Sequence, residues 1–232
     1  EEFFGRVIEE GTRSSVTDFG IHCMLLPDPA VAARVDALLA MGISSFKLMM
    51  AYGRRGWVSD DHVLAQSMDV IADRGGLAMV HAENDGLIRH LEEKYRSRDN
   101  YKAGTFLATR PNRSEGEAVY RAIQIAGAVG CPLYVVHLTT REGLDHVNRA
   151  KESGQRVYAE TCPQYLLLHT GDMSRLGGIL RLNPPIREQR HNQPLWDALM
   201  DGTIDMIATD HAPHSPEEKT RESIWACDCG FP

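Results

Sequence analysis

The sequence predicts an α/β protein whose parallel sheet forms part of a (β/α)8 barrel. Short apolar runs alternate along the chain with longer segments in which apolar residues recur every three or four positions. Ionisable residues lie at the C-terminal ends of several of these runs, where a barrel of this kind places its active site. Six runs cannot close a barrel of eight strands, so we expect an incomplete barrel that lacks about two βα units at its front.

The six apolar runs are the expected strands. They are apolar almost throughout and do not alternate with polar residues, as expected for strands that are buried on both faces. An open doubly wound sheet would give the same rhythm, but the glycine-rich phosphate-binding patterns that usually accompany it are missing from the sequence. The expected strands span residues 16–26, 44–50, 77–83, 132–140, 156–162 and 205–212.

The segments between the strands are the expected helices. Each ends at a glycine, which is typical of a helix with a C-terminal cap. These helices span residues 29–42, 60–76, 114–130, 140–154 and 191–202. The basic, polar segment from Arg96 to Arg113 has no such pattern, and we expect it to be a surface loop.

Composition and charge limit the classes of partner. The net charge of −7 and the absence of clustered Lys and Arg argue against nucleic acid, which leaves small molecules as the expected partners. No apolar run is long enough to span a membrane. The five cysteines are scattered, without a CxxC pair, which favours reduced thiols and a cytoplasmic location.

The chain begins at Glu1 without a methionine and stops abruptly at Pro232. We therefore expect residues 1–232 to be one partial catalytic barrel from inside a longer protein. The parts expected to be missing are the first βα units and a C-terminal portion.

Four ionisable residues stand within or at the ends of four different expected strands, namely Lys47, His81, His137 and Asp210. Each alone has a structural explanation: a hydrogen-bonded core histidine, a lysine that reaches the surface along its methylene stem, or an aspartate in a turn. Together they would be costly to bury without partners, and a metal cluster removes that cost. Imidazoles and a carboxylate suit zinc, with manganese or cobalt as alternatives, whereas Lys47 could take part only as a carboxylated amine.

Six linked motifs extend this pattern over essentially the whole chain. They are SFKLMMAY, MVHAEN, YVVHLT, AETCPQYLLL, NPPIRE and TDHAPHSPEEK. In this order the set resembles the cyclic-amidohydrolase branch of the amidohydrolase superfamily, a class of metal-dependent hydrolases. That branch contains the dihydropyrimidinases and D-hydantoinases, with the allantoinases and dihydroorotases as close relatives.

The resemblance implies a role for each matching residue. Lys47 would be the lysine that CO2 carboxylates to bridge two divalent metal ions, most simply zinc. His81 and His137 would hold the more buried ion, and Asp210 would bind the other ion and act as general base. The family also has a His-x-His pair on its first strand, which this sequence lacks, in agreement with missing front units.

The resemblance also implies a reaction, the opening of a small cyclic amide such as a hydantoin or dihydropyrimidine to an N-carbamoyl amino acid. A hydroxide bridging the metals would attack the ring carbonyl, and Asp210 would handle the proton. Tyr52 would polarise the carbonyl, and Asn183 would contact the substrate ring. No organic cofactor is needed, and relatives of this type are mostly dimers or tetramers, so a homo-oligomer is expected.

Several alternatives stay open. NPPIRE and TDHAPHSPEEK are closer to dihydroorotases and some allantoinases, whereas Lys47 favours a hydantoinase or dihydropyrimidinase. A non-catalytic, dihydropyrimidinase-like scaffold protein is the alternative from another class. His211 and His214 are interpreted either as residues that support the metal ligands or as turn residues, and Cys162 as a packing residue.

The loop after Tyr52 carries Arg54, Arg55 and Trp57. Either both arginines are solvated, or they face the site and favour an acidic or polar substituent on the substrate.

Overall fold

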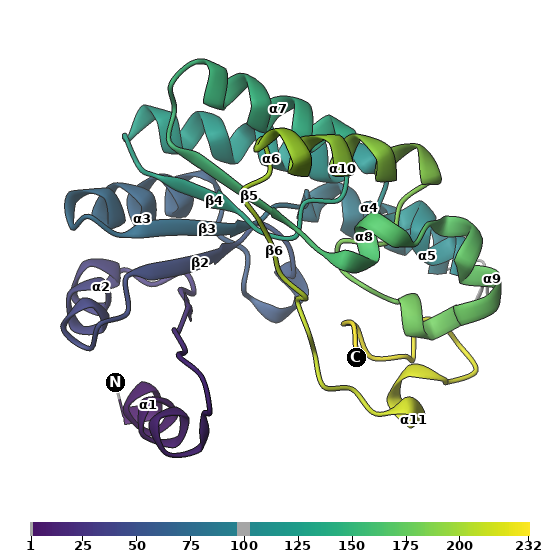
Figure 1. The fold of residues 1–232 in the computed structure, drawn as a ribbon, viewed down its shortest axis with the longest axis horizontal. Helices are drawn as coiled ribbons and strands as arrows, with labels where there is room; N and C mark the ends of the chain where they lie inside the picture. The colour runs from purple at the N-terminus through teal and green to yellow at the C-terminus, as the bar shows by residue number, and fades with distance from the viewer. Residues whose placement is uncertain (1, 97–102) are drawn as a thin grey trace.

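The computed structural model describes residues 2–96 and 103–232, and within them six parallel strands form one sheet (Figure 1). Neighbours in the sheet follow each other in the sequence, from β1 to β6. Every neighbouring pair is parallel. The strands are β1 (Cys23–Met24), β2 (Ser45–Met49), β3 (Leu77–His81), β4 (Leu133–Val135), β5 (Val157–Thr161) and β6 (Met206–Ile207).

This strand order distinguishes the two architectures that the sequence allowed. A doubly wound sheet reverses its strand order at a switch point, whereas the strands of a barrel pair consecutively. The order here has no reversal, and β1 and β6 are the two open edges of the sheet. The predicted α/β class and incomplete barrel are therefore confirmed.

All six expected strands form, but each is shorter than its apolar run. The run at 132–140, for example, is a strand only over β4, although the N–H groups of Val136 and Leu138 still donate to the neighbouring strands β3 and β5. The five expected helices are also present, and some begin at side-chain caps such as Asp60 and Thr140. They are α2 (Val31–Ala40), α3 (Asp61–Asp73), α6 (Asn112–Ala128), α7 (Arg141–Glu152) and α10 (Asn192–Asp201).

Further helices lie where none was predicted. The α-helices are α1 (Glu2–Ser14), α4 (Asp85–Arg96), α5 (Ala103–Thr109), α8 (Pro163–Leu167), α9 (Met173–Leu176) and α11 (Pro216–Lys219). The 3-10 turns are η1 (Gly53–Arg55), η2 (Thr170–Asp172), η3 (Gly177–Leu180) and η4 (Gln189–His191).

The prediction of a surface loop from Arg96 to Arg113 is wrong for the part of this segment that the structure describes. Residues 97–102 lie outside the described part, but α5 and the start of α6 occupy most of the remainder. Phe106 and Arg110 are buried. The basic composition was misleading because the charge of Arg110 is used inside the protein and not at its surface.

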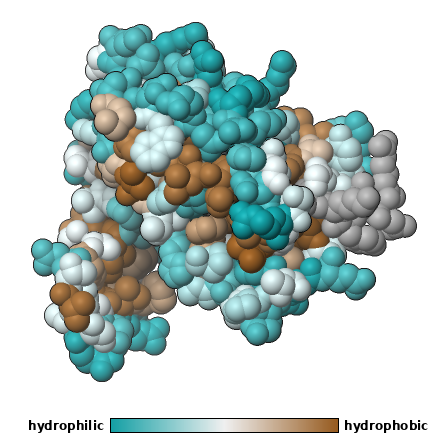
Figure 2. Space-filling view, turned by 45° about the vertical axis from the view of Figure 1, so that its right-hand side comes forward, coloured by the Kyte–Doolittle hydropathy of each residue, from teal (hydrophilic) through white to brown (hydrophobic). Residues whose placement is uncertain are grey.

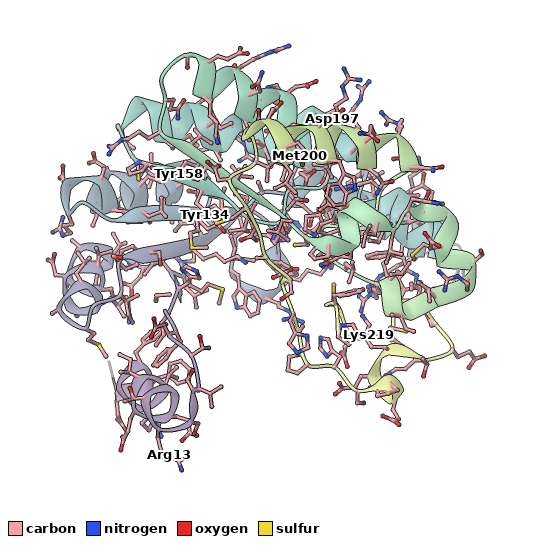
Figure 3. The ribbon with its side chains drawn as sticks, viewed as in Figure 1. Arg13, Tyr134, Tyr158, Asp197, Met200 and Lys219 are labelled. Carbon is pink, nitrogen blue, oxygen red and sulfur yellow. The ribbon has the colours of Figure 1, made fainter. Side chains whose placement is uncertain are left out.

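The register of the sheet separates two faces. One row runs across the strands through Phe46, Ala78, Leu133 and Val157, all of which are buried in the main core, on the side that α6 and α7 cover in Figure 1. The next row runs through Lys47, Met79, Tyr134 and Tyr158, and therefore faces the opposite side. Tyr134 and Tyr158 lie close together on neighbouring strands in Figure 3. Lys47 thus points to the inner side of the barrel arc.

Large apolar side chains are exposed on the two edge strands. Met24 lies on β1, and Met206 and Ile207 lie on β6. Figure 2 shows apolar areas interrupting an otherwise hydrophilic face. Apolar side chains on an edge strand are expected where a further strand would pair with that edge and bury them. Their exposure here agrees with an incomplete barrel.

Two other sequence expectations can be compared with the structure. Among the described residues no helix has the length and hydropathy needed to cross a membrane. All five cysteines lie in the described part, and each is a free thiol.

The end of α10 provides a stability test. Gly202 caps this helix with φ 84°, and an added Cβ would meet no atom within 4 Å. Replacing Gly202 by Ala should lower the free energy of unfolding by about 1 kcal/mol, because only the left-handed backbone opposes the new methyl group. Gly104→Ala, in α5 and equally unhindered, is the control and should be neutral or stabilising. Urea unfolding of the full-length protein measures both, and equal effects would contradict the explanation.

Candidate metal and amide site

The carboxyl ends of the strands bring the predicted site residues together. Lys47 and His81 project from β2 and β3, and His137 and Asp210 follow the ends of β4 and β6. A cavity of about 340 Å³ lies between them. All six residues predicted from the sequence line this cavity: Lys47, Tyr52, His81, His137, Asn183 and Asp210.

Backbone strain is concentrated at this cavity. In the described chain, three residues other than glycine have a positive φ: Tyr52 at 70°, His137 at 40° and Asp210 at 48°. All three are among the predicted site residues. Such conformations cost of order 1–3 kcal/mol each and persist where surrounding contacts fix them. Here they turn the side chains that follow strand ends back towards the cavity.

Hydrogen bonds hold two of these strained positions. The backbone N–H of His137 donates to Glu160 of β5 at 3.1 Å. The side-chain amide of Gln164 donates to the carbonyl of Thr209 at 3.0 Å and so fixes the chain immediately before Asp210. The strand next to each loop, or the helix that follows it, therefore sets the position of the site residue.

His81 and His137 face each other. Nδ1 of His81 and Nε2 of His137 lie 3.0 Å apart, and both rings are almost fully buried. Burial is the main cause that lowers the pKa of His81, and it lowers the pKa of His137 still further. Both imidazoles are therefore neutral near pH 7, which is the form that binds a metal ion.

Glu83 and Arg110 orient His81 from behind. Nε2–H of His81 donates to Oε2 of Glu83 at 3.0 Å, and the same oxygen accepts from Arg110 at 2.5 Å. Burial opposes the ionisation of Glu83, but Arg110 and His81 outweigh it and lower the pKa of Glu83 to about 2. An ionised Glu83 keeps the proton of His81 on Nε2, so the Nδ1 lone pair faces the cavity.

A second buried pair supports the loop after β4. Glu115 accepts hydrogen bonds from the backbone N–H and the hydroxyl of Thr139, and Nε–H of Arg187 donates to the same hydroxyl at 2.7 Å. Burial is the main cause that raises the pKa of Glu115, and Arg187 opposes it. Arg187 also donates to the carbonyl of Arg110, which links the supports of His137 and His81.

Tyr52 and Asn183 form a polar pair in the cavity, with the Tyr52 ring 5.2 Å from the ring of His81. The amide nitrogen of Asn183 donates to the Tyr52 hydroxyl oxygen at 3.1 Å, which leaves the phenolic hydrogen free to donate. Burial is the main cause that raises the pKa of Tyr52, so the phenol stays protonated. Oδ1 of Asn183 is buried without a hydrogen-bond partner among the described residues. The pair thus offers one free donor and one free acceptor.

Asp210 stands at the exposed edge beside Lys47. Protein atoms packed around its carboxyl group desolvate it and raise its pKa, while Lys47 and His81 act in the opposite direction. The carboxylate oxygens are therefore within the electrostatic reach of both residues. Asp210 is placed to share a cation with them or to exchange a proton in the cavity.

Two further histidines, His211 and His214, follow Asp210. His211 forms an isolated β-bridge with Phe231, and Nε2 of His214 lies 3.1 Å from the carbonyl of Cys229. Both histidines line the cavity, and these contacts fix the turn. Cys162 is fully buried, and burial raises the pKa of its thiol, so this cysteine packs in the core.

The donor set fits a metal ion. Two neutral imidazole nitrogens, Nδ1 of His81 and Nε2 of His137, converge from different strands and lie 3.0 Å apart. Lys47 and Asp210 line the same cavity. Imidazole with carboxylate is the usual ligand set of zinc, and a carbamate on Lys47 would add further oxygens.

Sequence reasoning missed Glu83 and Arg110. The signal for Glu83 was its position two residues after His81, because alternate residues of an extended chain face the same way. Arg110 gave no such signal, since it lies outside the strands in the segment that was expected to be a surface loop.

Comparisons with known proteins place this arrangement in a family. The chain is 38% identical to a D-hydantoinase of Rhizobium radiobacter over 202 residues, which are 85% of this chain and 44% of that protein. It is 32% identical to an allantoinase of Bacillus velezensis over 219 residues, 94% of this chain and 48% of that protein. No family model matches the chain.

Solved structures show the same likeness. A D-hydantoinase (dihydropyrimidinase) from Thermus sp. matches all of this chain and 52% of its own, with TM-score 0.93 and 29% identity. A D-hydantoinase from Bacillus sp. AR9 matches 99% of this chain and 52% of its own, with TM-score 0.91 and 30% identity. The chain spans about half the length of the curated relatives it matches.

The fold is that of an incomplete barrel of the amidohydrolase class. Within that class, the chain belongs to the cyclic amidohydrolases, the family of the D-hydantoinases, dihydropyrimidinases and allantoinases.

The role of Glu83 can be tested through metal affinity. Glu83→Gln keeps the shape but removes the charge that orients His81, so zinc affinity should fall by about 10- to 100-fold. Competition titration of the full-length protein against a chromogenic chelator measures this. Glu117→Gln is the matched control, because Glu117 pairs with Arg121 at the surface. Equal affinity of the two variants would exclude a positioning role.

The ion pair also predicts a pH dependence of stability. The pKa of Glu83 is about 2 in the folded protein against a usual 4.5, so its stabilisation is complete above pH 4.5 and declines as the pH falls towards 2. The glutamine of the Glu83→Gln variant cannot titrate. The difference in unfolding free energy between metal-free wild type and this variant should therefore shrink by about 2 kcal/mol between pH 6 and pH 3. Urea titrations at several pH values measure it, and a constant difference would contradict the assignment.

Proposed function

We propose that the protein containing this segment hydrolyses small cyclic amides, such as hydantoins or dihydropyrimidines, to N-carbamoyl amino acids. The observation that carries the proposal is the convergence of Lys47, His81, His137 and Asp210 on one cavity from four strands. The named relatives support it, since they are hydantoinases and allantoinases. A scaffold function alone would not account for a buried, neutral imidazole pair held by a buried ion pair.

The proposed metal centre contains two divalent ions, most simply zinc. His81 and His137 would hold one ion, Asp210 the other, and Lys47, carboxylated by CO2, would bridge them. When bound, the ions supply a water of lowered pKa and polarise a carbonyl group. Glu83 fixes the tautomer of His81, and Asp210 accepts the proton of the attacking water and delivers it to the leaving ring nitrogen.

The pair of Tyr52 and Asn183 matches the chemistry of a cyclic amide. The free phenolic hydrogen of Tyr52 can donate to a ring carbonyl and stabilise the oxyanion that forms there. The unpartnered Oδ1 of Asn183 can accept from a ring N–H. An amide ring presents both groups at neighbouring positions, so one substrate can satisfy both residues.

The choice among hydantoinase, dihydropyrimidinase, allantoinase and dihydroorotase activity is also part of the proposal. Lys47 favours the first two, and the relatives include D-hydantoinases and allantoinases. A homo-oligomer is proposed on the family resemblance. A cytoplasmic location is proposed because all five cysteines are free thiols.

The metal proposal is tested by removing and restoring the ions. Full-length protein treated with a chelator should lose ring opening of hydantoin and dihydrouracil and regain it with zinc. Lys47→Ala should bind less metal and lose activity, and Asp210→Asn should lower kcat by about 100-fold or more. If the fully zinc-loaded protein is inactive, the proposed enzymatic function is excluded. If the protein binds no metal, the scaffold alternative is favoured.

The amide-binding pair makes a separate prediction. Tyr52→Phe keeps the ring but removes the hydroxyl donor, so kcat should fall by about 100-fold while bound metal stays unchanged. Tyr120→Phe is the control, because Tyr120 is exposed on α6. Steady-state kinetics and metal analysis check the result, and a rise in KM at constant kcat would point to binding alone.

A further inference from the structure

The turn after Tyr52 sends two neighbouring arginines in different directions. Arg54 forms ion pairs with Glu92 at 3.8 Å and Glu93 at 3.2 Å, both on α4 outside the cavity. Arg55 instead lines the cavity that holds His81 and Asp210. In the chain that the structure describes, Arg55 has no carboxylate within ion-pair distance.

Hydrogen bonds hold the backbone of the turn that carries Arg54 and Arg55. The N–H of Gly53 donates to Asp85 at 2.7 Å, and a Cβ at Gly53 would collide with the same carboxylate, so a larger residue would have to displace Asp85. Asp85 is held in turn by Arg89. The N–H of Arg55 donates to the carbonyl of Tyr52 at 2.9 Å, which ties the arginine to the residue proposed to contact the substrate.

Two aromatic rings lie close to the guanidinium group of Arg55. The carbon at the centre of the group lies 4.9 Å from the centre of the Trp57 ring and 5.9 Å from that of Tyr52. A guanidinium group beside aromatic rings keeps N–H donors that can bind a carboxylate with two hydrogen bonds. In the described chain no carboxylate pairs with Arg55, so these donors are available to a ligand.

The charges around the cavity leave Arg55 without a partner within the site. Besides Lys47 and Arg55, the cavity is lined by two carboxylates, Asp210 and Asp228. Asp210 is influenced by Lys47, and Asp228 pairs with Arg221 at 3.8 Å. The uncompensated cation of the cavity thus stands beside Tyr52, which is proposed to contact the ring of the substrate.

We propose that Arg55 is a specificity residue that binds a carboxylate on the side chain of the ring substrate, so that the enzyme prefers cyclic amides with an anionic substituent. The inference rests on the proposed function and names the substrate class of the same site. Tyr52 and Asn183 bind the amide of the ring, and Arg55 binds the substituent attached to the ring.

The test compares two substrates of nearly equal shape, hydantoin with a 5-carboxymethyl group and hydantoin with a 5-carbamoylmethyl group. The zinc-loaded full-length protein should open the acid with the higher kcat/KM, and added salt should reduce this preference. Arg55→Ala should lower the ratio of kcat/KM for acid over amide by about tenfold or more. Arg55→Lys should retain part of the preference, and Arg55→Glu should reverse it.

Arg54→Ala is the matched control, because Arg54 pairs outside the cavity, and it should leave the ratio unchanged. A wild-type preference for the amide, or the same ratio in Arg55→Ala and wild type, overturns the inference while ring opening itself stands. If no ring is opened, the proposed function fails. Calorimetric binding of the acid to wild type and Arg55→Ala then still decides the role of Arg55, and equal affinities overturn it.

Discussion

Parallel pairing of consecutive strands is the constraint on which the rest of this structure depends. Because all six strands run the same way, their carboxyl ends meet at one edge of the sheet. Lys47, His81, His137 and Asp210 are far apart in the sequence, and this topology alone brings them to one cavity. The register then decides which face each strand residue presents, so that Lys47 points inward while Phe46 enters the helix-covered core.

Assembling the cavity costs free energy, and contacts of the residues around it offset that cost. Two imidazoles are buried as neutral groups, and three residues hold left-handed backbone conformations. Buried ion pairs are weak contributors to stability, but they fix geometry when every charge has a partner. Glu83 with Arg110 acts in this way behind His81. Behind His137, hydrogen bonds through Thr139 connect Glu115 and Arg187. In the described chain, the residues other than glycine that adopt a left-handed backbone all lie at the proposed functional site.

The predictions from the sequence succeeded where a pattern repeats along the chain. The six strands and five helices were found because apolar periodicity directly reflects burial. Helices α4 and α5 were missed because their sequences are strongly polar or short, and tertiary packing stabilises them more than local preference does. Arg110 was placed at the surface because a cation is usually solvated there, and nothing local shows that Glu83 neutralises it.

The sequence by itself determined the class of fold, the metal-ligand candidates and the resemblance to cyclic amidohydrolases. These depend on residue types and on spacing along the chain, which any sequence displays. Only the tertiary structure decided that Asn183 meets Tyr52, that Arg110 neutralises Glu83, and that Arg55 and not Arg54 lines the cavity. Those contacts join residues far apart in the chain, or depend on the direction of a turn, and three-dimensional packing alone fixes both.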